Sequence, residues 1–243
     1  MRTLLFALCL TFAASAAAAP PDIASAVADP RRPDTDKQRD EARKPAAMLA
    51  FAGVRPGLTV MDLIPGGGYF TRLFAAAVGP EGRVFAFSPT EFDGFLKGKE
   101  PPVVAVAAAY PNVTVIRASV NTLVVPQKLD LIWTSQNYHD LKNGKEADTA
   151  LVNRSAFAAL KPGGLYIILD HAAVDGTGVR DTGTLHRIDE AAVKAEVTAA
   201  GFVFVGDSDV LRNPADARNL AVFDPAIRGH TDQFVLKFRK PGG

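Results

Sequence analysis

Short apolar runs alternate with helical segments from residue 59 onward, and this alternation constrains the fold more than any other feature of the sequence. Near-continuous apolar strands separated by helices are typical of a mostly parallel sheet that is covered on both faces. Between 202–205 and 234–238 no convincing helix intervenes, so we expect these two strands to pair antiparallel at an edge. The sequence therefore predicts an α/β domain, Rossmann-like and doubly wound, with a mostly parallel sheet and an antiparallel edge strand. The predicted strands are 59–64, 83–87, 113–116, 129–134, 165–169, 202–205 and 234–238, with helices that include 146–160 and 189–200.

The start of the chain has the layout of a secretory signal peptide. Arg2 supplies a positive charge, 4–12 is apolar, and 13–19 is a run of small residues. The apolar run is far shorter than the ~20 residues that span a bilayer. We therefore expect cleavage after Ala16 or Ala19, export to a compartment such as the periplasm, and no stable membrane insertion after processing. The predicted divisions are a signal peptide (1–19), an N-terminal arm (20–45) and a folded domain (46–243).

The charge of the chain is balanced, with 27 Lys and Arg against 26 Asp and Glu. Loss of Arg2 with the leader would make the two counts equal. A balanced chain has no global electrostatic reason to bind nucleic acid. The same cleavage would remove Cys9, the single cysteine, which suits an oxidising compartment. We expect Arg31, Arg32 and the charged stretch 34–44 to be solvated, although Arg39 and Asp40 could instead form part of a lid.

A glycine-rich turn, 62–68, lies between the first predicted strand and the first helix of the alternation. Glycines let the backbone turn tightly and approach a ligand, and a helix that follows presents free N–H groups. Ligands of open α/β sheets bind beyond the carboxyl ends of the strands. The turn lacks the Lys-Ser or Lys-Thr of a phosphate loop and the full spacing of a dinucleotide fingerprint. It therefore predicts a nucleotide or nucleoside site, with a plain flexible turn as the alternative.

The residues Asp62-Leu63-Ile64-Pro65-Gly66-Gly67-Gly68 resemble the first motif of class I S-adenosylmethionine-dependent methyltransferases. The resemblance extends over most of 45–240, and the Asn137-Tyr138-His139-Asp140 segment resembles a group of exported, predicted methyltransferases. It implies S-adenosylmethionine as the cofactor and a small-molecule methyl acceptor as the substrate. Two positions depart from the pattern: Ile64 replaces the usual first glycine, and Ser88 replaces the acidic residue that binds the ribose, with Glu91 the nearest carboxylate. The cofactor-binding residues implied are Asp62, Pro65, Gly66, Gly67, Gly68, Tyr69, Ser88 and Glu91.

Polar residues follow two further predicted strands, and they should gather at the same edge as the glycine-rich turn. His139 is our first choice for a base that accepts a proton from the methyl acceptor, and His171 is the second. Asp140 would orient the base, and Asn137 completes the predicted catalytic set. The alternative is that Asn137 and His139 only satisfy backbone groups at a strand end.

Two other functions fit the same residues. A non-catalytic module that binds S-adenosylmethionine or a nucleoside would use the same turn. A metal-dependent enzyme would draw ligands from the polar edge, since imidazole and carboxylate suit zinc or manganese. No compact ligand motif is present, so we assign no metal ligand, and the absence of a Gly-x-Ser-x-Gly elbow argues against a serine hydrolase. The residues available to a metal are His139, Asp140, Asp170, His171, Asp175 and His186.

Overall fold

The computed structural model describes residues 23–144 and 146–242, so the predicted signal peptide lies outside the described residues. A seven-stranded sheet forms the centre of this part, with the strand order β3-β2-β1-β4-β5-β7-β6. This arrangement confirms the predicted doubly wound α/β fold. The strands are β1 (Thr59–Leu63), β2 (Arg83–Pro89), β3 (Val113–Ala118), β4 (Leu129–Ser135), β5 (Leu160–His171), β6 (Val203–Ser208) and β7 (Gln233–Arg239).

The sheet is mostly parallel, as predicted. Among the described strands, β7 runs antiparallel to both of its neighbours, β5 and β6. The antiparallel strand is therefore next to the edge, and β6 is the edge strand itself. The chain can enter β7 in the opposite direction because no crossover helix separates it from β6.

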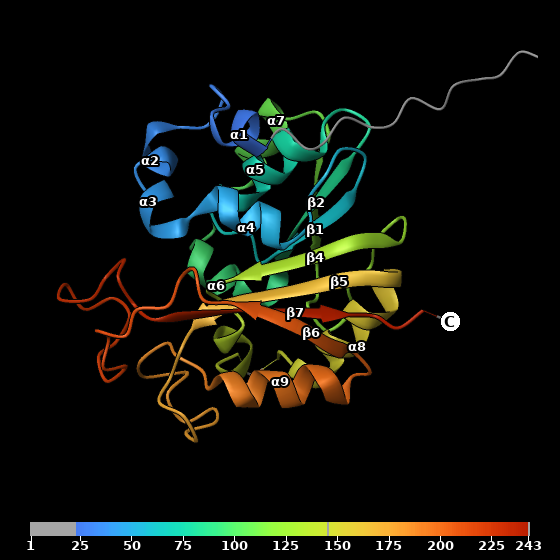
Figure 1. The fold of residues 1–243 in the computed structure, drawn as a ribbon. Helices are drawn as coiled ribbons and strands as arrows, with labels where there is room; N and C mark the ends of the chain where they lie inside the picture. Colours follow the sequence, from blue (N-terminus) through green and yellow to red (C-terminus); the bar gives the residue numbers. More distant parts are fainter. Residues whose placement is uncertain (1–22, 145, 243) are drawn as a thin grey trace, which may run out of the picture.

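Helices cover both faces of the sheet (Figure 1). In that view α1, α4, α5 and α7 lie above the sheet and α8 and α9 lie below it. Asp148 begins α8, because its carboxylate accepts hydrogen bonds from the N–H groups of Ala150 and Leu151. The helices are α1 (Ile23–Val27), α2 (Asp34–Lys37), α3 (Asp40–Arg43), α4 (Pro45–Phe51), α5 (Tyr69–Val78), α6 (Asp93–Leu96), α7 (Val104–Ala109), α8 (Thr149–Ala159) and α9 (Glu190–Ala199), with 3-10 turns η1 (Thr90–Phe92) and η2 (His139–Lys142).

The alternation of side chains along each strand divides the core into two layers. On β1, Val60 belongs to the cluster under α4 and α5, whereas Met61 and Leu63 belong to the cluster under α8 and α9. Both faces of the strand are buried, which explains why Val60, Met61 and Leu63 are all apolar. Trp133 of β4 is fully buried and packs against the ring of Phe70, with 4.6 Å between the ring centroids.

The segment before α4 is packed against the domain, and the expected solvation is wrong for Arg32 and Asp36. It holds for most of the stretch 34–44, in which Asp34, Lys37, Arg39, Glu41 and Lys44 are exposed. Arg32 is 1% exposed, and its guanidinium forms an ion pair of 2.5 Å with Asp40. The hydroxyl of Tyr69, from α5, donates a hydrogen bond of 2.6 Å to the same carboxylate. Asp36 is also buried and pairs with Arg72 of α5 at 2.9 Å. Tyr69 and Arg72 of α5 thus hold Asp40 and Asp36, and a pattern of local sequence does not reveal these contacts.

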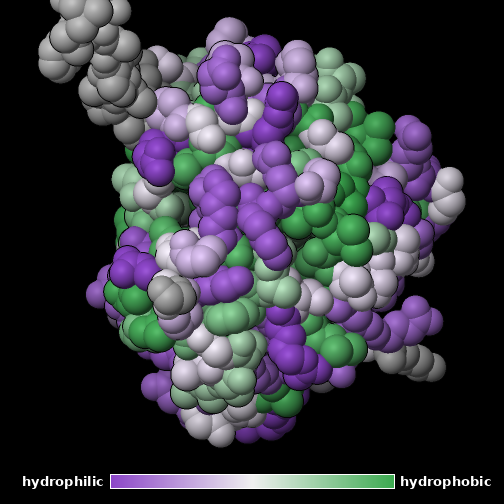
Figure 2. All heavy atoms as spheres, turned by 90° about the vertical axis from the view of Figure 1, so that its right-hand side faces the viewer, coloured by the Kyte–Doolittle hydropathy of each residue, from purple (hydrophilic) through white to green (hydrophobic). Residues whose placement is uncertain are grey.

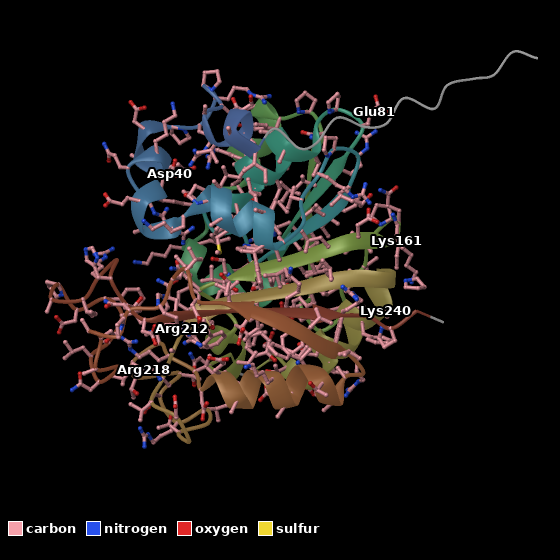
Figure 3. All side chains as sticks on the ribbon, in the orientation of Figure 1. Asp40, Glu81, Lys161, Arg212, Arg218 and Lys240 are labelled. Carbon is pink, nitrogen blue, oxygen red and sulfur yellow. The ribbon has the colours of Figure 1, made fainter. Side chains whose placement is uncertain are left out.

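The carboxyl and amino ends of the parallel strands differ in what surrounds them. Strands β4 and β5 point to the left in Figure 1, where the segments 172–189 and 209–232 extend from the domain. Asp40, Arg212 and Arg218 lie in this half of the molecule, whereas Glu81, Lys161 and Lys240 lie at the opposite end (Figure 3). Figure 2 views that opposite end, where hydrophilic residues gather between smaller hydrophobic areas. Across 23–144 and 146–242, no helix has the length and apolar character needed to cross a membrane.

Candidate functional site

The glycine-rich turn after β1 has a left-handed backbone at three positions. Ile64, Gly66 and Gly68 have φ angles of 60°, 55° and 79°. This conformation is easy for glycine but strained for a β-branched residue such as Ile64. The surroundings hold Ile64 in place, because its N–H donates to the carbonyl of Phe87 at 2.9 Å and the Asn137 amide donates to its carbonyl at 2.8 Å. Asn137 is therefore a brace for the turn.

Gly68 is required for packing as well as for its backbone angle. It is the N-cap of α5, and a Cβ added to it would lie 2.6 Å from a methyl group of Val106 on α7. A Cβ added to Gly66 or Gly67 would meet no atom within 4 Å. Gly66 and Gly67 border a cavity, whereas Gly68 brings α5 and α7 together.

A polar cavity of about 290 Å³ lies against the turn. Its charged residues are Asp62 from the end of β1 and the two arginines Arg39 and Arg43 from the segment before α4. The hydroxyl of Ser135, which is buried, has no hydrogen-bond partner among the described residues and lines the same cavity. The other lining residues are Ile64, Pro65, Gly66, Gly67, Tyr69, Phe70, Gln136 and Asn137.

Burial dominates the electrostatics of this cavity. It raises the pKa of Asp62 to about 7, although the hydroxyl of Thr71, 2.6 Å away, and the charge of Arg43 favour the ionised carboxylate. Burial, with Arg39 nearby, lowers the pKa of Arg43 to about 10. Arg43 remains a cation at neutral pH, and its guanidinium lies over the ring of Tyr69 and donates to the side chain of Gln136. The cavity thus contains two cations, Arg39 and Arg43, and one carboxyl group, that of Asp62, whose pKa lies near neutral pH.

A larger cavity of about 420 Å³ adjoins the polar one, since Ile64, Pro65, Gly66 and Gln136 line both. Its walls are largely apolar on the side of β2, where Ser88 is the polar residue at the end of the strand. The opposite side carries three histidines and Asp140. The other lining residues are Pro89, Phe92, Phe95, Leu96, Pro101, Pro102, His139, His171, His186, Val222 and Phe223.

His139 is held by Asp170, which lies next to the last residue of β5. The backbone N–H of His139 donates to one carboxylate oxygen, and its Nδ1 lies 2.8 Å from the other. Burial disfavours the charged imidazole, but the charge and hydrogen bond of Asp170, together with the charge of Asp140, outweigh it and raise the pKa of His139. Burial disfavours the ionised form of Asp170 too, yet His139 keeps the pKa of that carboxyl low. Because an ionised carboxylate only accepts hydrogen bonds, Nδ1 carries the proton, and Nε2 of the neutral ring has a free lone pair.

His139 has two further polar neighbours at the rim of the larger cavity. Its Nε2 lies 3.3 Å from Nδ1 of His186 and 3.4 Å from a carboxylate oxygen of Asp140. The other predicted base, His171, is also buried, and its Nδ1 lies 2.7 Å from the hydroxyl of Thr231. Burial lowers the pKa of His171 to about 4, so this imidazole is neutral at pH 7.

Most of the residues predicted for the site lie together. Asp62, Gly67, Tyr69 and Asn137 line the polar cavity; Ser88, His139 and Asp140 line the larger one; and Pro65 and Gly66 line both. Glu91 is placed differently. Its carboxylate accepts from the hydroxyl of Ser119 at 2.5 Å and from the N–H of Val120 at 3.0 Å. Asp175, from the metal alternative, is 93% exposed and pairs with Arg218.

Arg43 and Gln136 of the polar cavity were not among the predicted site residues, and the apolar contact of His186 was not predicted either. Arg43 and Gln136 line the cavity, but Arg43 lies in a stretch that looked solvated, and Gln136 belongs to no recognised pattern. The ring of His186 packs against Phe223, with 4.8 Å between centroids. That contact joins the two loop segments 172–189 and 209–232, and no local signal could have predicted it.

Comparison with curated proteins finds ubiquinone/menaquinone biosynthesis C-methyltransferases UbiE, while no family model matches the chain. The relative from Ectopseudomonas mendocina is 28% identical over 190 residues, which are 78% of this chain and 65% of the relative. The relative from Salmonella paratyphi B is 32% identical over 189 residues, 76% of this chain and 65% of the relative. The relative from Pasteurella multocida is 35% identical over 121 residues, 49% and 42% of the two chains. The match thus spans less than two thirds of the length of each.

Solved structures share the fold at low sequence identity. An S-adenosylmethionine-dependent methyltransferase from Aquifex aeolicus matches with a TM-score of 0.57 and 18% identity over 86% of this chain and 98% of its own. Another from Mesorhizobium loti has a TM-score of 0.58 and 18% identity, covering 83% and 99%. The [4+2]-cyclase SpnF also matches, with a TM-score of 0.60 and 16% identity, covering 86% and 81%. The chain is thus similar in sequence to the UbiE C-methyltransferases, and it shares its fold with S-adenosylmethionine-dependent methyltransferases of solved structure.

Proposed function

We propose that the protein binds S-adenosylmethionine in the two adjoining cavities and transfers its methyl group to a small molecule. The observation that carries this proposal is the polar cavity, which places an acid opposite two arginines beside the glycine-rich turn. The amino-acid end of S-adenosylmethionine carries one ammonium and one carboxylate. Asp62 suits the ammonium, and Arg39 and Arg43 suit the carboxylate. The unpartnered hydroxyl of Ser135 offers a further hydrogen bond.

The larger cavity suits the nucleoside part on its β2 side. Phe92 and Leu96 supply an apolar surface for an adenine ring, and Ser88 is the polar group nearest to the end of β2. Because Ser119 and Val120 already hold the carboxylate of Glu91, the ribose hydroxyls would depend on Ser88. A serine hydroxyl is a weaker partner than a carboxylate, so we expect lower affinity than an acidic residue at this position would give.

The histidine side of the same cavity suits the methyl acceptor. S-adenosylmethionine, when bound, supplies an electrophilic methyl group, and positioning of the acceptor provides much of the acceleration. We assign the role of base to His139, because its Nε2 borders the cavity and Asp170 stabilises the protonated ring. Asp140 orients His139, whereas Asn137 acts by bracing the turn. A cavity of this size suits a small acceptor, and the balanced charge of the chain favours no nucleic acid.

Calorimetric titration with S-adenosylmethionine and S-adenosylhomocysteine tests the proposal. The Gly67→Asp variant adds a negative charge inside the polar cavity, at a position with room for a Cβ. Gly94→Asp adds the same charge at an exposed position in α6 that also has room. We expect the Gly67 variant to bind at least tenfold more weakly and the Gly94 variant to bind like the wild type. No binding to the wild type at high micromolar ligand would sink the proposal.

A non-catalytic binding module is the second candidate, and the engagement of Glu91 by Ser119 favours it. The [4+2]-cyclase SpnF, which shares this fold, also indicates that the fold is not limited to one activity. Binding of S-adenosylmethionine without turnover over a panel of phenolic, amine and thiol acceptors would support this second candidate.

We also propose that the protein is exported and that its leader is removed after Ala16 or Ala19. Support comes from the arrangement of charge, apolar run and small residues in 1–19. Expression of the full-length chain, followed by fractionation and mass measurement of the product, tests this. An uncleaved product in the cytoplasm would contradict it.

A further inference from the structure

We propose that His139, Asp140 and His186 form a binding site for a divalent metal ion such as Zn²⁺, at the rim of the larger cavity. The Nε2 of His139, the Nδ1 of His186 and one Oδ1 of Asp140 form a triangle. Its sides are 3.3 Å between the two nitrogens, 3.4 Å from His139 to Asp140, and 3.6 Å from His186 to Asp140. Three potential ligand atoms of different residues thus converge on one point.

The size of the triangle fits a tetrahedral ion. With metal–ligand bonds of about 2.1 Å, tetrahedral geometry places ligand atoms about 3.4 Å apart. The three sides differ from that value by at most about 0.2 Å, so one ion could reach all three atoms with bonds of ordinary length. Two imidazoles and one carboxylate are also a ligand set that catalytic zinc sites use.

On the side of its ring away from the triangle, His139 contacts Asp170, a partner that suits a metal-binding histidine. Asp170 lies 2.8 Å from Nδ1, so it fixes the proton there and leaves the Nε2 lone pair toward His186 and Asp140. Metal-bound histidines usually donate their second N–H to a carboxylate in this way, which orients the ring and makes it a better ligand. Asp170 is fully buried and would act by positioning His139.

The backbone at His186 is strained, and its neighbour holds it there. His186 has a φ of 54°, which non-glycine residues adopt rarely. The next residue, Arg187, is fully buried, with an ion pair of 2.9 Å to Asp216 and a hydrogen bond of 3.0 Å to the carbonyl of Ala172. This anchor keeps the imidazole of His186 beside His139 at an energetic cost, as is common at functional sites.

An ion at this site would have an open position toward the larger cavity, which all three ligand residues line. The acceptor proposed above would lie in that cavity, so this step rests on the proposed function. An anionic oxygen, such as that of a phenol or an enol, is the ligand that such a position favours. With the ion bound, Nε2 of His139 would be a metal ligand and could not act as the base. The ion would then face the acceptor in place of the imidazole.

Calorimetric titration of the chelator-treated protein with Zn²⁺ tests the site. We expect one ion per chain and no comparable binding of Mg²⁺, which prefers oxygen ligands. His186→Ala should weaken Zn²⁺ binding at least tenfold, whereas His230→Ala removes an exposed histidine outside the triangle and should leave it unchanged. Circular dichroism identifies a variant that fails to fold, and His186→Gln then replaces it.

Two outcomes would overturn the site: no stoichiometric Zn²⁺ binding, or an equal loss in the His186 and His230 variants. Co²⁺ gives an independent spectroscopic readout, since a tetrahedral site produces strong visible absorption and an adventitious octahedral one does not. For the acceptor step, 4-nitrocatechol is the probe, and its spectrum should shift with the loaded wild type but not with the His186 variant. An unchanged spectrum overturns this step alone. Because Zn²⁺ binding is measured without S-adenosylmethionine, the failure of the metal site and of the methyltransferase proposal are distinguishable.

Discussion

Replacement of Asp62 by Asn should change how the stability of the protein depends on pH. The carboxyl is buried, and burial raises its pKa to about 7, from 3.8 for the unperturbed side chain. Between these two pH values the folded protein retains a proton that the unfolded chain has released. The contribution of Asp62 to stability is therefore complete below about pH 4 and is lost as pH rises through about 7. Asn has the same size, accepts a hydrogen bond from Thr71, and does not titrate.

The magnitude follows from the pKa shift. Each pH unit across the window changes the free energy of unfolding by about 1.4 kcal/mol, so the full window is worth about 4 kcal/mol. Between pH 5 and pH 8 the wild type should lose about 3 kcal/mol relative to Asp62→Asn. Urea unfolding of both proteins at pH 5, 6, 7 and 8 measures this, and the difference between them removes the contributions of the other titrating groups. A difference that stays constant with pH would refute the reasoning.

The remaining predictions concern the turn and its supports. Gly68→Ala should lower the free energy of unfolding by about 2 kcal/mol, because its φ is 79° and the Cβ would lie 2.6 Å from Val106. Gly67→Ala, where the Cβ meets nothing, is the matched control for urea unfolding and should cost less than half as much. Asn137→Ala should cost about 1–3 kcal/mol in the same measurement, because it leaves the half-buried carbonyl of Ile64 without its donor. Asp40→Asn should cost about 3 kcal/mol by leaving the buried Arg32 unpaired, whereas Asp34→Asn, at a side chain that is 90% exposed, should change stability by less than about 0.5 kcal/mol. Equal effects within either pair would contradict the account.

The framework of the fold was predictable because its strands are buried on both faces. The middle of a strand such as β1 is then apolar, as at Val60 and Met61, and the helical spacing after it is equally local. The start of β5 was not predictable in this way. The predicted strand began at residue 165, whereas β5 begins at Leu160 and pairs with β4 across a register shift.

The site was predictable where it depends on backbone geometry and less so where it depends on distant partners. The glycine-rich turn can be predicted from the sequence, because left-handed backbone angles and close approach of the backbone to a ligand favour glycine. The burial of Arg32 and the place of Arg43 in the polar cavity depend on α5 and β4, which are distant in sequence. The meeting of His139 and His186 likewise depends on two loops that the sheet edge brings together. Ile64 depends on both local geometry and a distant partner. Its backbone angle is unfavourable for isoleucine, and a hydrogen bond from Asn137 holds it there.

A crystal structure of the protein with S-adenosylhomocysteine would test the central claim most directly. We expect the amino-acid end of the ligand to lie among Asp62, Arg39 and Arg43 in the polar cavity. We also expect the adenine on the Phe92 side of the larger cavity, with the sulfur facing the side that His139 lines. A ligand bound elsewhere, or one whose amino-acid end leaves the polar cavity empty, would contradict the central claim.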